Sequence, residues 1–222
     1  WHISHEGGPI ENIETEPDES FWVLTVSPEK APDKPEYVEI EFDAGAPVAV
    51  NGEKMKPKDI VKTLNKIGGK NGIGRCDMVE NRLVGMKSHG LYETPGGTIL
   101  NYAHSELESI TLDRDSQHYK EVVASRYAEL IYNGQWFSPL CSAMNKFFEE
   151  IDKTTSGTVK LKLYKGNIIP AGRISKYSLY SEKMASFGDV SLYDHKDASG
   201  FIRCFTLPNR VRSMMEKQLE NK

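Results

Sequence analysis

The sequence predicts an α+β fold, in which a mixed or antiparallel sheet packs with several helices and an extended amphipathic helix forms the carboxy terminus. Two observations carry this prediction. Apolar and polar residues alternate with a strand-like period over residues 37–55 and 159–169, and they repeat with a helical period over longer segments between residues 57 and 151. Strand runs followed by helix runs are typical of α+β domains.

The first third of the chain predicts a loop and a meander. Residues 11–36 are rich in Glu, Asp and Pro, which predicts a surface loop, and the run FWVLTV at 21–26 predicts a short strand within it. In residues 37–55 the alternating apolar side chains are interrupted by turn residues at Gly45 and at the Asn-Gly pair 51–52. This pattern predicts an antiparallel hairpin or meander.

Four segments predict amphipathic helices. Their expected first or capping residues, in chain order, are Pro57, Thr94, Asp113 and Ser138. We expect the first helix to end at Gly68-Gly69 and the third at Asn133-Gly134. The residues expected to face inward are Ile60, Val61, Leu64 and Ile67; Ile99, Leu100, Ala103 and Leu107; Tyr119, Val122, Val123, Tyr127, Leu130 and Ile131; and Leu140, Ala143, Met144, Phe147, Phe148 and Ile151.

The remaining segments predict strands and a terminal helix. Residues 76–88 have strand-like character, and residues 159–163 alternate with lysines before a turn at 165–167 that returns a partner strand. From Leu207 onward one helical stripe is apolar. It consists of Val211, Met214, Met215 and Leu219. Such a helix either folds back on its own domain or docks on a neighbouring subunit, and the pattern alone leaves both open.

Composition limits the function classes. Of the 222 residues, 38% are hydrophobic and 27% are charged, which allows a substantial core and is typical of neither a disordered nor a membrane protein. The net charge of −4 argues against broad attraction to nucleic acid or anionic lipid. No apolar stretch approaches about eighteen residues, and no export signal is recognisable. We therefore expect no nucleic-acid partner, no membrane association and small polar metabolites as ligands.

Cysteine spacing and the first residue add two expectations. Cys76, Cys141 and Cys204 lie far apart and form no CxxC pair. This indicates neither a zinc site nor a disulfide framework, and it fits a reducing, cytoplasmic location. Because the chain begins at Trp1 rather than at a methionine, we expect a fragment of a longer protein.

Two glycine-rich strings have the composition of anion-binding loops. GGKNGIGR at 68–75 lacks the spacing of a Walker or Rossmann loop and follows a predicted helix, so a helix end and turn is the favoured interpretation. YETPGGTIL at 92–100 begins a helix, whose free N–H groups could face a carboxylate or phosphate. From this string alone, an ordinary capped helix is the favoured interpretation.

Glu80 and Tyr92 are candidates for an amino-acid site. They lie twelve residues apart and border one pocket if the intervening turn folds back. A carboxylate pairs with an ammonium group, and a tyrosine hydroxyl donates to a carboxylate or carbonyl. Taken alone, a glutamate such as Glu80 is most often a surface ion-pair partner.

The string HISHEGG at residues 2–8 places Ser4 between two histidines. His2 and His5 have a spacing that chelates on a helix, but no HExxH motif is present and the following Gly-Gly-Pro disfavours a helix, so we expect no metal site. Ser4 lies in no GxSxG elbow. We interpret Ser4 as a hydrogen-bond donor rather than a nucleophile.

Several strings, in order across nearly the whole chain, resemble the argininosuccinate synthase family. One such string would be a weak indication, but the ordered set is specific. The strings are HISHEGG, GKNGIGRCDMVENRLVGMKSHGLYETPGGTIL, ITLDRD, YAELIYNGQWFSP, LKLYKGNI, SLY and KDASGFI.

The resemblance implies a ligase that joins citrulline and aspartate using ATP. In that reaction the citrulline ureido oxygen is adenylated, pyrophosphate leaves, and the aspartate amine displaces AMP. The resemblance also implies citrulline contacts at Ser4, Glu80 and Tyr92, whose work is to position the substrate rather than to act as acid or base. No catalytic residue is expected in this chain.

The resemblance further implies how the protein is divided. Residues 1–206 correspond to the carboxy-terminal synthetase domain and residues 207–222 to an oligomerisation helix of a homotetramer, which favours docking over fold-back. The family's ATP loop, SGG-x-D-[ST], is absent. We therefore expect ATP, with Mg²⁺, and aspartate to bind mainly to an amino-terminal domain missing from this chain, and we expect the chain alone to be inactive.

Three positions depart from the family pattern. His5 stands where Tyr is usual, His89 where Arg is usual, and Lys176 where Pro is common. Histidine is mostly neutral near pH 7, so we expect an anion or interface contact at the turn containing His89 to be weaker or pH-dependent. The expected effect is on assembly or affinity rather than on reaction type.

Two other function classes remain for comparison. A non-catalytic amino-acid-binding and oligomerisation module of the same fold is the alternative to a ligase, and intact Ser4, Glu80 and Tyr92 favour the ligase. A nucleic-acid-binding domain requires a basic face, whereas the lysine-rich strand at 160–165 is short and the net charge is negative.

Overall fold

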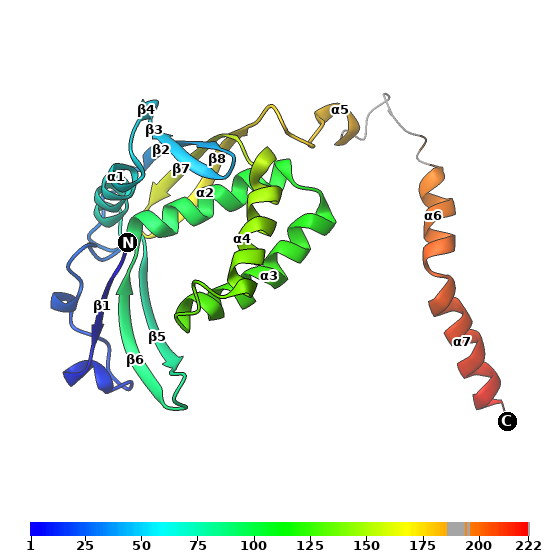
Figure 1. The fold of residues 1–222 in the computed structure, drawn as a ribbon, viewed down its shortest axis with the longest axis horizontal. Coiled ribbons are helices and arrows are strands. Elements are labelled where there is room, and N and C mark those ends of the chain that lie inside the picture. Colours follow the sequence, from blue (N-terminus) through cyan, green and yellow to red (C-terminus); the bar gives the residue numbers. More distant parts are fainter. Residues whose placement is uncertain (186–193, 195, 222) are drawn as a thin grey trace. The chain divides into compact units, whose positions relative to one another are not determined.

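The computed structural model describes residues 1–185, 194 and 196–221 (Figure 1). The chain divides into two units, Trp1–Leu179 and Tyr180–Lys222. The first unit combines two antiparallel sheets with helices, which confirms the predicted α+β class. The second unit is helical over most of its described residues. Residues 191–193, which carry the SLY string, lie outside the described part.

The larger sheet has the strand order β4-β3-β2-β7-β8. Its strands are β2 (Glu36–Asp43), β3 (Ala46–Val50), β4 (Glu53–Lys54), β7 (Gly157–Tyr164) and β8 (Asn167–Ile174). Two-residue turns at 44–45, 51–52 and 165–166 have positive φ at both positions, as type I′ hairpins require. The meander predicted over 37–55 and the hairpin predicted around residue 166 are confirmed.

Helices α1 (Pro57–Lys70) and α2 (Pro95–Thr111) pack together and against this sheet (Figure 1). Their predicted inward residues belong to the main core, with Val61 and Ile67 at its partly buried edge. Burial of each such aliphatic side chain contributes about 1.5–3 kcal/mol. The fully buried members include Val38, Ile40, Ile60, Leu64, Ile99, Leu107 and Leu161.

Helix α1 ends in a Schellman motif at Gly72 rather than at the predicted Gly68-Gly69 stop. Gly72 has a φ of 71°, and its N–H donates to the Gly69 carbonyl at 3.2 Å. The Ile73 N–H donates to the Gly68 carbonyl at 2.9 Å. Gly69 lies within the helix, and a Cβ there would be 2.1 Å from the Leu24 carbonyl oxygen. The glycine pair therefore permits close packing instead of ending the helix.

The strand predicted at 21–26 is wrong. A 3₁₀ turn, η2 (Glu19–Phe21), is followed by irregular backbone. The N–H groups of Val23, Leu24 and Thr25 donate to the carboxylate of Glu93, at 2.8, 2.9 and 2.8 Å. Because one side chain accepts these donors, the segment forms no ladder with a neighbouring strand.

The smaller sheet has the order β1-β6-β5, with β6 in the centre. Its strands are β1 (Ile3–Glu6), β5 (Arg75–Asn81) and β6 (Lys87–Glu93), and a 3₁₀ turn, η1 (Gly8–Glu11), follows β1. The strand-like segment predicted at 76–88 is thus a hairpin whose turn spans residues 82–86. The pairing of β1 with β6 was not predicted.

Helices α3 (Arg114–Tyr132) and α4 (Pro139–Ile151) begin at the predicted caps Asp113 and Ser138, whose side chains accept backbone N–H groups. They pack mainly on each other, and η3 (Asp152–Thr154) follows. Their predicted inward faces are partly wrong, because one helical hairpin buries only the sides that meet. The exposed members are Tyr119, Val122, Leu140 and Ala143.

The second unit contains α5 (Glu182–Ala185), α6 (Asp197–Phe205) and α7 (Leu207–Glu220). The terminal helix begins at the predicted residue, whereas α6 was not predicted. The stripe on α7 is exposed, with Val211 62% and Leu219 64% exposed. Among the described residues, no helix is both long and apolar enough to cross a membrane.

Candidate functional site

The predicted residues Ser4, Glu80 and Tyr92 lie on one face of the smaller sheet. Ser4 on β1 and Cys76 on β5 are both opposite Tyr92 on β6, and Glu80 is opposite Ser88. Residues opposite one another in antiparallel strands share a face, as do alternate residues along one strand. Ser4 is exposed and lies two register rows from Glu80.

Tyr92 reaches Glu80 by lying back along its own strand. The Tyr92 ring passes over Gly90, and its hydroxyl donates to Glu80 Oε2 at 3.0 Å. The Ser88 hydroxyl donates to the other carboxylate oxygen at 3.3 Å. Arg82 Nε lies 3.5 Å from that same oxygen and donates to Ser88 Oγ at 2.8 Å. The Glu80 carboxylate is therefore oriented by three neighbours.

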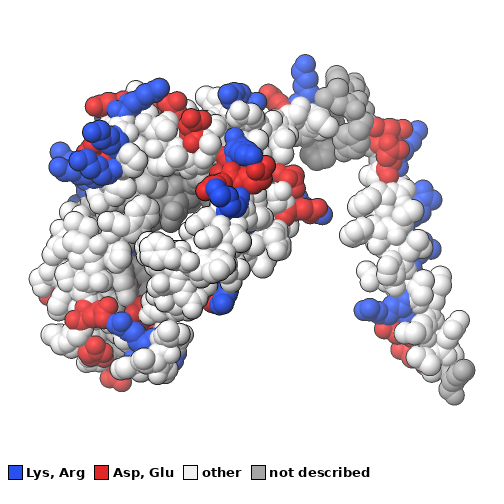
Figure 2. All heavy atoms as spheres, in the orientation of Figure 1, with Lys and Arg blue, Asp and Glu red and all other residues white. Residues whose placement is uncertain are grey.

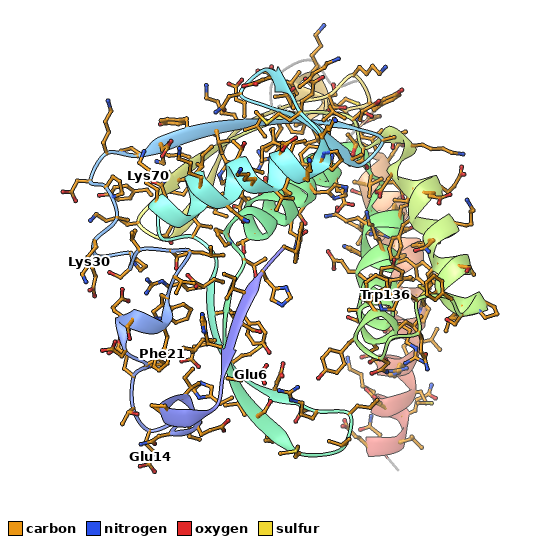
Figure 3. The ribbon with its side chains drawn as sticks, turned by 60° about the vertical axis from the view of Figure 1, so that its left-hand side comes forward. Glu6, Glu14, Phe21, Lys30, Lys70 and Trp136 are labelled. Atoms are coloured by element: carbon orange, nitrogen blue, oxygen red, sulfur yellow. The ribbon has the colours of Figure 1, made fainter. Side chains whose placement is uncertain are left out.

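The charges on this face favour a cationic group. Arg82 forms ion pairs with both Glu80 and Glu6 (Figure 3 labels Glu6 on β1). Two carboxylates and one guanidinium leave one negative charge without a compensating cation among these three groups. Burial, with the hydrogen bond to Glu80, raises the pKa of Tyr92 to about 12. The phenol is therefore a permanent donor near neutral pH, and the face offers an anion beside a hydroxyl.

The opposite face of β6 is structural, and it contains His89. His89 is 5% exposed. Its Nε2 donates to Asp77 Oδ1 at 2.6 Å, and its Nδ1 contacts the Ile10 carbonyl oxygen. The prediction that His89 lies in a turn is wrong, because His89 lies within the central strand β6. Its anionic contact is with Asp77 of the same chain. Since both ring nitrogens face acceptors, the imidazolium satisfies both, and these two contacts raise the pKa of His89.

The spacing of His2 and His5, which would allow both to bind one metal ion on a helix, does not bring them together in a strand. His5 lies within β1, where residues three apart point to opposite faces. The His2 ring instead lies 6.1 Å from the Tyr92 ring, between centroids. The two histidines therefore do not converge on one ion.

The two glycine-rich strings are held by internal hydrogen bonds. The N–H groups at 71–73 close the end of α1, which confirms the helix-end interpretation of GGKNGIGR. At the start of α2, the Gly96 N–H donates to Asn65 Oδ1 of α1 at 2.8 Å. Thr94 is at the cap position, but its side chain makes no capping bond. Thr94 therefore occupies the predicted cap position, but the side-chain acceptor at this helix start is Asn65 rather than Thr94.

A second titratable cluster joins α2, α3 and η3, and no local sequence pattern indicates it. One ligand atom each from His104, Glu108 and Asp152 lies within 4.8 Å of the others. The Lys120 ammonium, however, donates to both Glu108 and Asp152, the latter at 2.7 Å. Because the Lys120 ammonium already supplies the cation, this cluster is better explained as an ion-pair network than as a metal site.

Comparison with known proteins gives a consistent result. The family model for the arginosuccinate synthase C-terminal domain matches residues 1–212. The chain is 60% identical over 217 residues to the argininosuccinate synthase of Carboxydothermus hydrogenoformans, and 58% identical over 218 residues to that of Desulforamulus reducens. Each match covers 98% of the chain and 54% of the relative. The chain thus spans about half the length of the curated relatives it matches.

Proposed function

The chain belongs to the argininosuccinate synthase family as its carboxy-terminal domain, and from this membership we propose that it is part of a ligase of arginine biosynthesis. The proposed reaction joins citrulline and aspartate to argininosuccinate and converts ATP to AMP and pyrophosphate. Family membership was the inference from the ordered sequence strings, and the matches confirm it. The reaction and its substrates are the proposal.

The observation that carries the proposal is the Glu80–Tyr92 hydrogen bond on the face that also bears Ser4. In the proposed role the α-ammonium group of citrulline takes the place of the Tyr92 hydroxyl on Glu80. The Tyr92 hydroxyl, which has one proton to donate, then turns to the carboxylate or ureido oxygen of the substrate, and the Ser4 hydroxyl donates to the same groups. These residues hold the ureido group for attack, which makes each displacement effectively intramolecular. Proton transfer by a side chain of this chain is not required.

The remaining parts of the proposal concern partners. We assign ATP, its Mg²⁺ and aspartate mainly to an amino-terminal domain preceding this chain. Residues 1–206 would form the synthetase domain, and residues 207–222 would join subunits of a homotetramer in the cytoplasm. The exposed apolar stripe of α7 supports the subunit contact. Acidic and basic side chains are interspersed on the face drawn in Figure 2, which gives no support to a nucleic-acid partner.

The test is argininosuccinate formation by the full-length protein from citrulline, aspartate and ATP. Glu80→Gln should raise the KM for citrulline by about tenfold or more, because a charge-assisted contact is lost. Glu53→Gln, on the exposed strand β4, is the matched control and should leave that KM unchanged. A folded, tetrameric wild type without activity would refute the ligase and favour the non-catalytic binding and oligomerisation module.

A further inference from the structure

Gly90 lies directly beneath the ring of Tyr92. A Cβ added at Gly90 would lie 2.9 Å from Tyr92 Cε2, 3.2 Å from its hydroxyl oxygen and 3.3 Å from Cζ. The first distance is well below the optimal separation of two carbon atoms in contact, about 3.5–4.0 Å. Any side chain at this position would therefore push the phenol away from the sheet.

The backbone gives no reason for a glycine at this position. Gly90 is not among the residues with positive φ, and it lies in the central strand, paired with Glu6 on one side and Met78 on the other. Glycine weakens a strand interior, because it loses more conformational entropy on folding and provides no side chain to pack. The close contact with Tyr92 is the feature of the site that excludes a larger residue.

The strand register explains why this position matters. Tyr92 lies in one row of the sheet and Glu80 lies two rows away, opposite Ser88, with Gly90 in the row between them. The phenol can span those rows only if the intermediate row is flat beneath it. Tyr92 and Glu80 then meet at 3.0 Å.

We infer that Gly90 is a positioning residue of the citrulline site, which rests on the proposed function: its missing side chain lets Tyr92 lie against Glu80 and so sets where the amino-acid end of the substrate binds. Gly90 itself need not touch the substrate. Its effect on affinity passes through the position of the Tyr92 hydroxyl.

A purely structural role predicts a different result. In a purely structural role, the aromatic ring over the strand glycine would simply cover exposed backbone. Gly90→Ala would then leave substrate affinity unchanged and would tend to stabilise the strand, since alanine loses less entropy on folding. Positioning instead predicts weaker citrulline binding in a variant that folds normally. Tyr92 is only partly buried, so its ring can move outward without unfolding the sheet.

The experiment compares the full-length wild type with Gly90→Ala, Tyr92→Phe and the double variant. Crystal structures should show the Tyr92 hydroxyl within hydrogen-bonding distance of Glu80 in the wild type and beyond that distance in Gly90→Ala. In kinetic assays Gly90→Ala should raise the KM for citrulline by about tenfold, the effect of losing a hydrogen bond to a charged group. The kcat at saturating citrulline and the KM for aspartate should change little.

The double variant and a control isolate the cause. If Gly90 acts through the Tyr92 hydroxyl, Gly90→Ala/Tyr92→Phe should have the same citrulline KM as Tyr92→Phe alone, because coupled effects do not add. Gly172→Ala in β8 is the matched control, since its Cβ would meet only the Lys160 Cβ, at 3.8 Å. It should change neither structure nor KM.

The outcomes separate this inference from the proposed function. An unmoved Tyr92 with an unchanged KM in Gly90→Ala would overturn the inference and leave the ligase standing. An inactive wild type would refute the ligase, while the position of Tyr92 in the crystal structures would still decide the steric effect. If Gly90→Ala fails to fold, Gly90→Ala/Tyr92→Leu should restore folding by removing the ring, and failure to restore it would overturn the inference.

Discussion

Replacing Glu93 with glutamine should destabilise the segment at 23–25, although the two side chains have nearly the same shape. The buried carboxylate accepts hydrogen bonds from the N–H groups of Val23, Leu24 and Thr25 and from the Thr25 hydroxyl. Oε1 receives three of these bonds, and Oε2 receives the Val23 N–H at 2.8 Å. Glutamine has one oxygen, so its NH₂ group would face the Val23 N–H when that oxygen takes the Oε1 position.

The cost follows from the donor left without an acceptor. An unsatisfied buried N–H costs about 1–3 kcal/mol, and the three remaining bonds lose the strengthening given by a charged acceptor. We expect a total of about 2–4 kcal/mol. Amide hydrogen exchange at 23–25 is the suitable assay, because it reports local opening without requiring the whole protein to unfold in one step.

The exchange of these three amides should accelerate by roughly thirtyfold or more, since each 1.4 kcal/mol is about tenfold. Glu41→Gln, at an exposed position on β2, is the matched control and should leave the exchange unchanged. Exchange at 23–25 that is equal in wild type and Glu93→Gln would refute the reasoning, because it would mean that the carboxylate does not hold the segment.

The remaining predictions concern His89 and two helical glycines. The hydrogen bond to Asp77 raises the pKa of His89 in the folded protein. The protonated His89 therefore stabilises the folded state fully below the unfolded pKa of about 6.5, and this stabilisation is lost as pH rises through the higher folded pKa. In urea unfolding, His89→Gln should therefore be less stable than wild type at about pH 6 and should approach it at about pH 9, and a gap that widens with pH would contradict the assignment. Gly69→Ala should lower the thermal midpoint because its Cβ would meet the Leu24 carbonyl, whereas Gly200→Ala, with nothing within 4 Å, should stabilise α6 by about 0.5–1 kcal/mol. Equal shifts in the two glycine variants would contradict the close-approach argument.

The sequence predicted those elements whose signal is local and periodic. The predictions of helix α1 and strand β2 were correct because the buried residues of these elements repeat with periods of about 3.6 and 2 residues. The predicted caps Asp113 and Ser138 were correct because a cap acts within three residues. The segment at 21–26 was wrong because the acceptor of its N–H groups, Glu93, lies about seventy residues away. No local pattern contains that partner.

Periodicity also predicts which residues share a face without predicting what covers it. The apolar residues of α3 do share faces, yet Tyr119 and Val122 are exposed while Leu130 is buried. The candidate site shows the same limit. The Glu80–Tyr92 contact was expected from a turn that folds back, but the position of Ser4 depends on the pairing of β1 with β6, which the string HISHEGG does not specify.

In the central strand β6, the residues of the predicted binding site alternate with buried residues that hold the strand in place. One face carries the predicted site and the other carries buried anchors, because successive side chains point to opposite sides. The site face consists of Ser88, Gly90 and Tyr92, and the anchored face consists of His89, Leu91 and Glu93. The anchors fix the backbone from which Tyr92 projects, and a site is held more precisely when the strand beneath it is rigid. Substitutions on the anchored face should therefore act mainly on stability, and those on the site face mainly on substrate affinity.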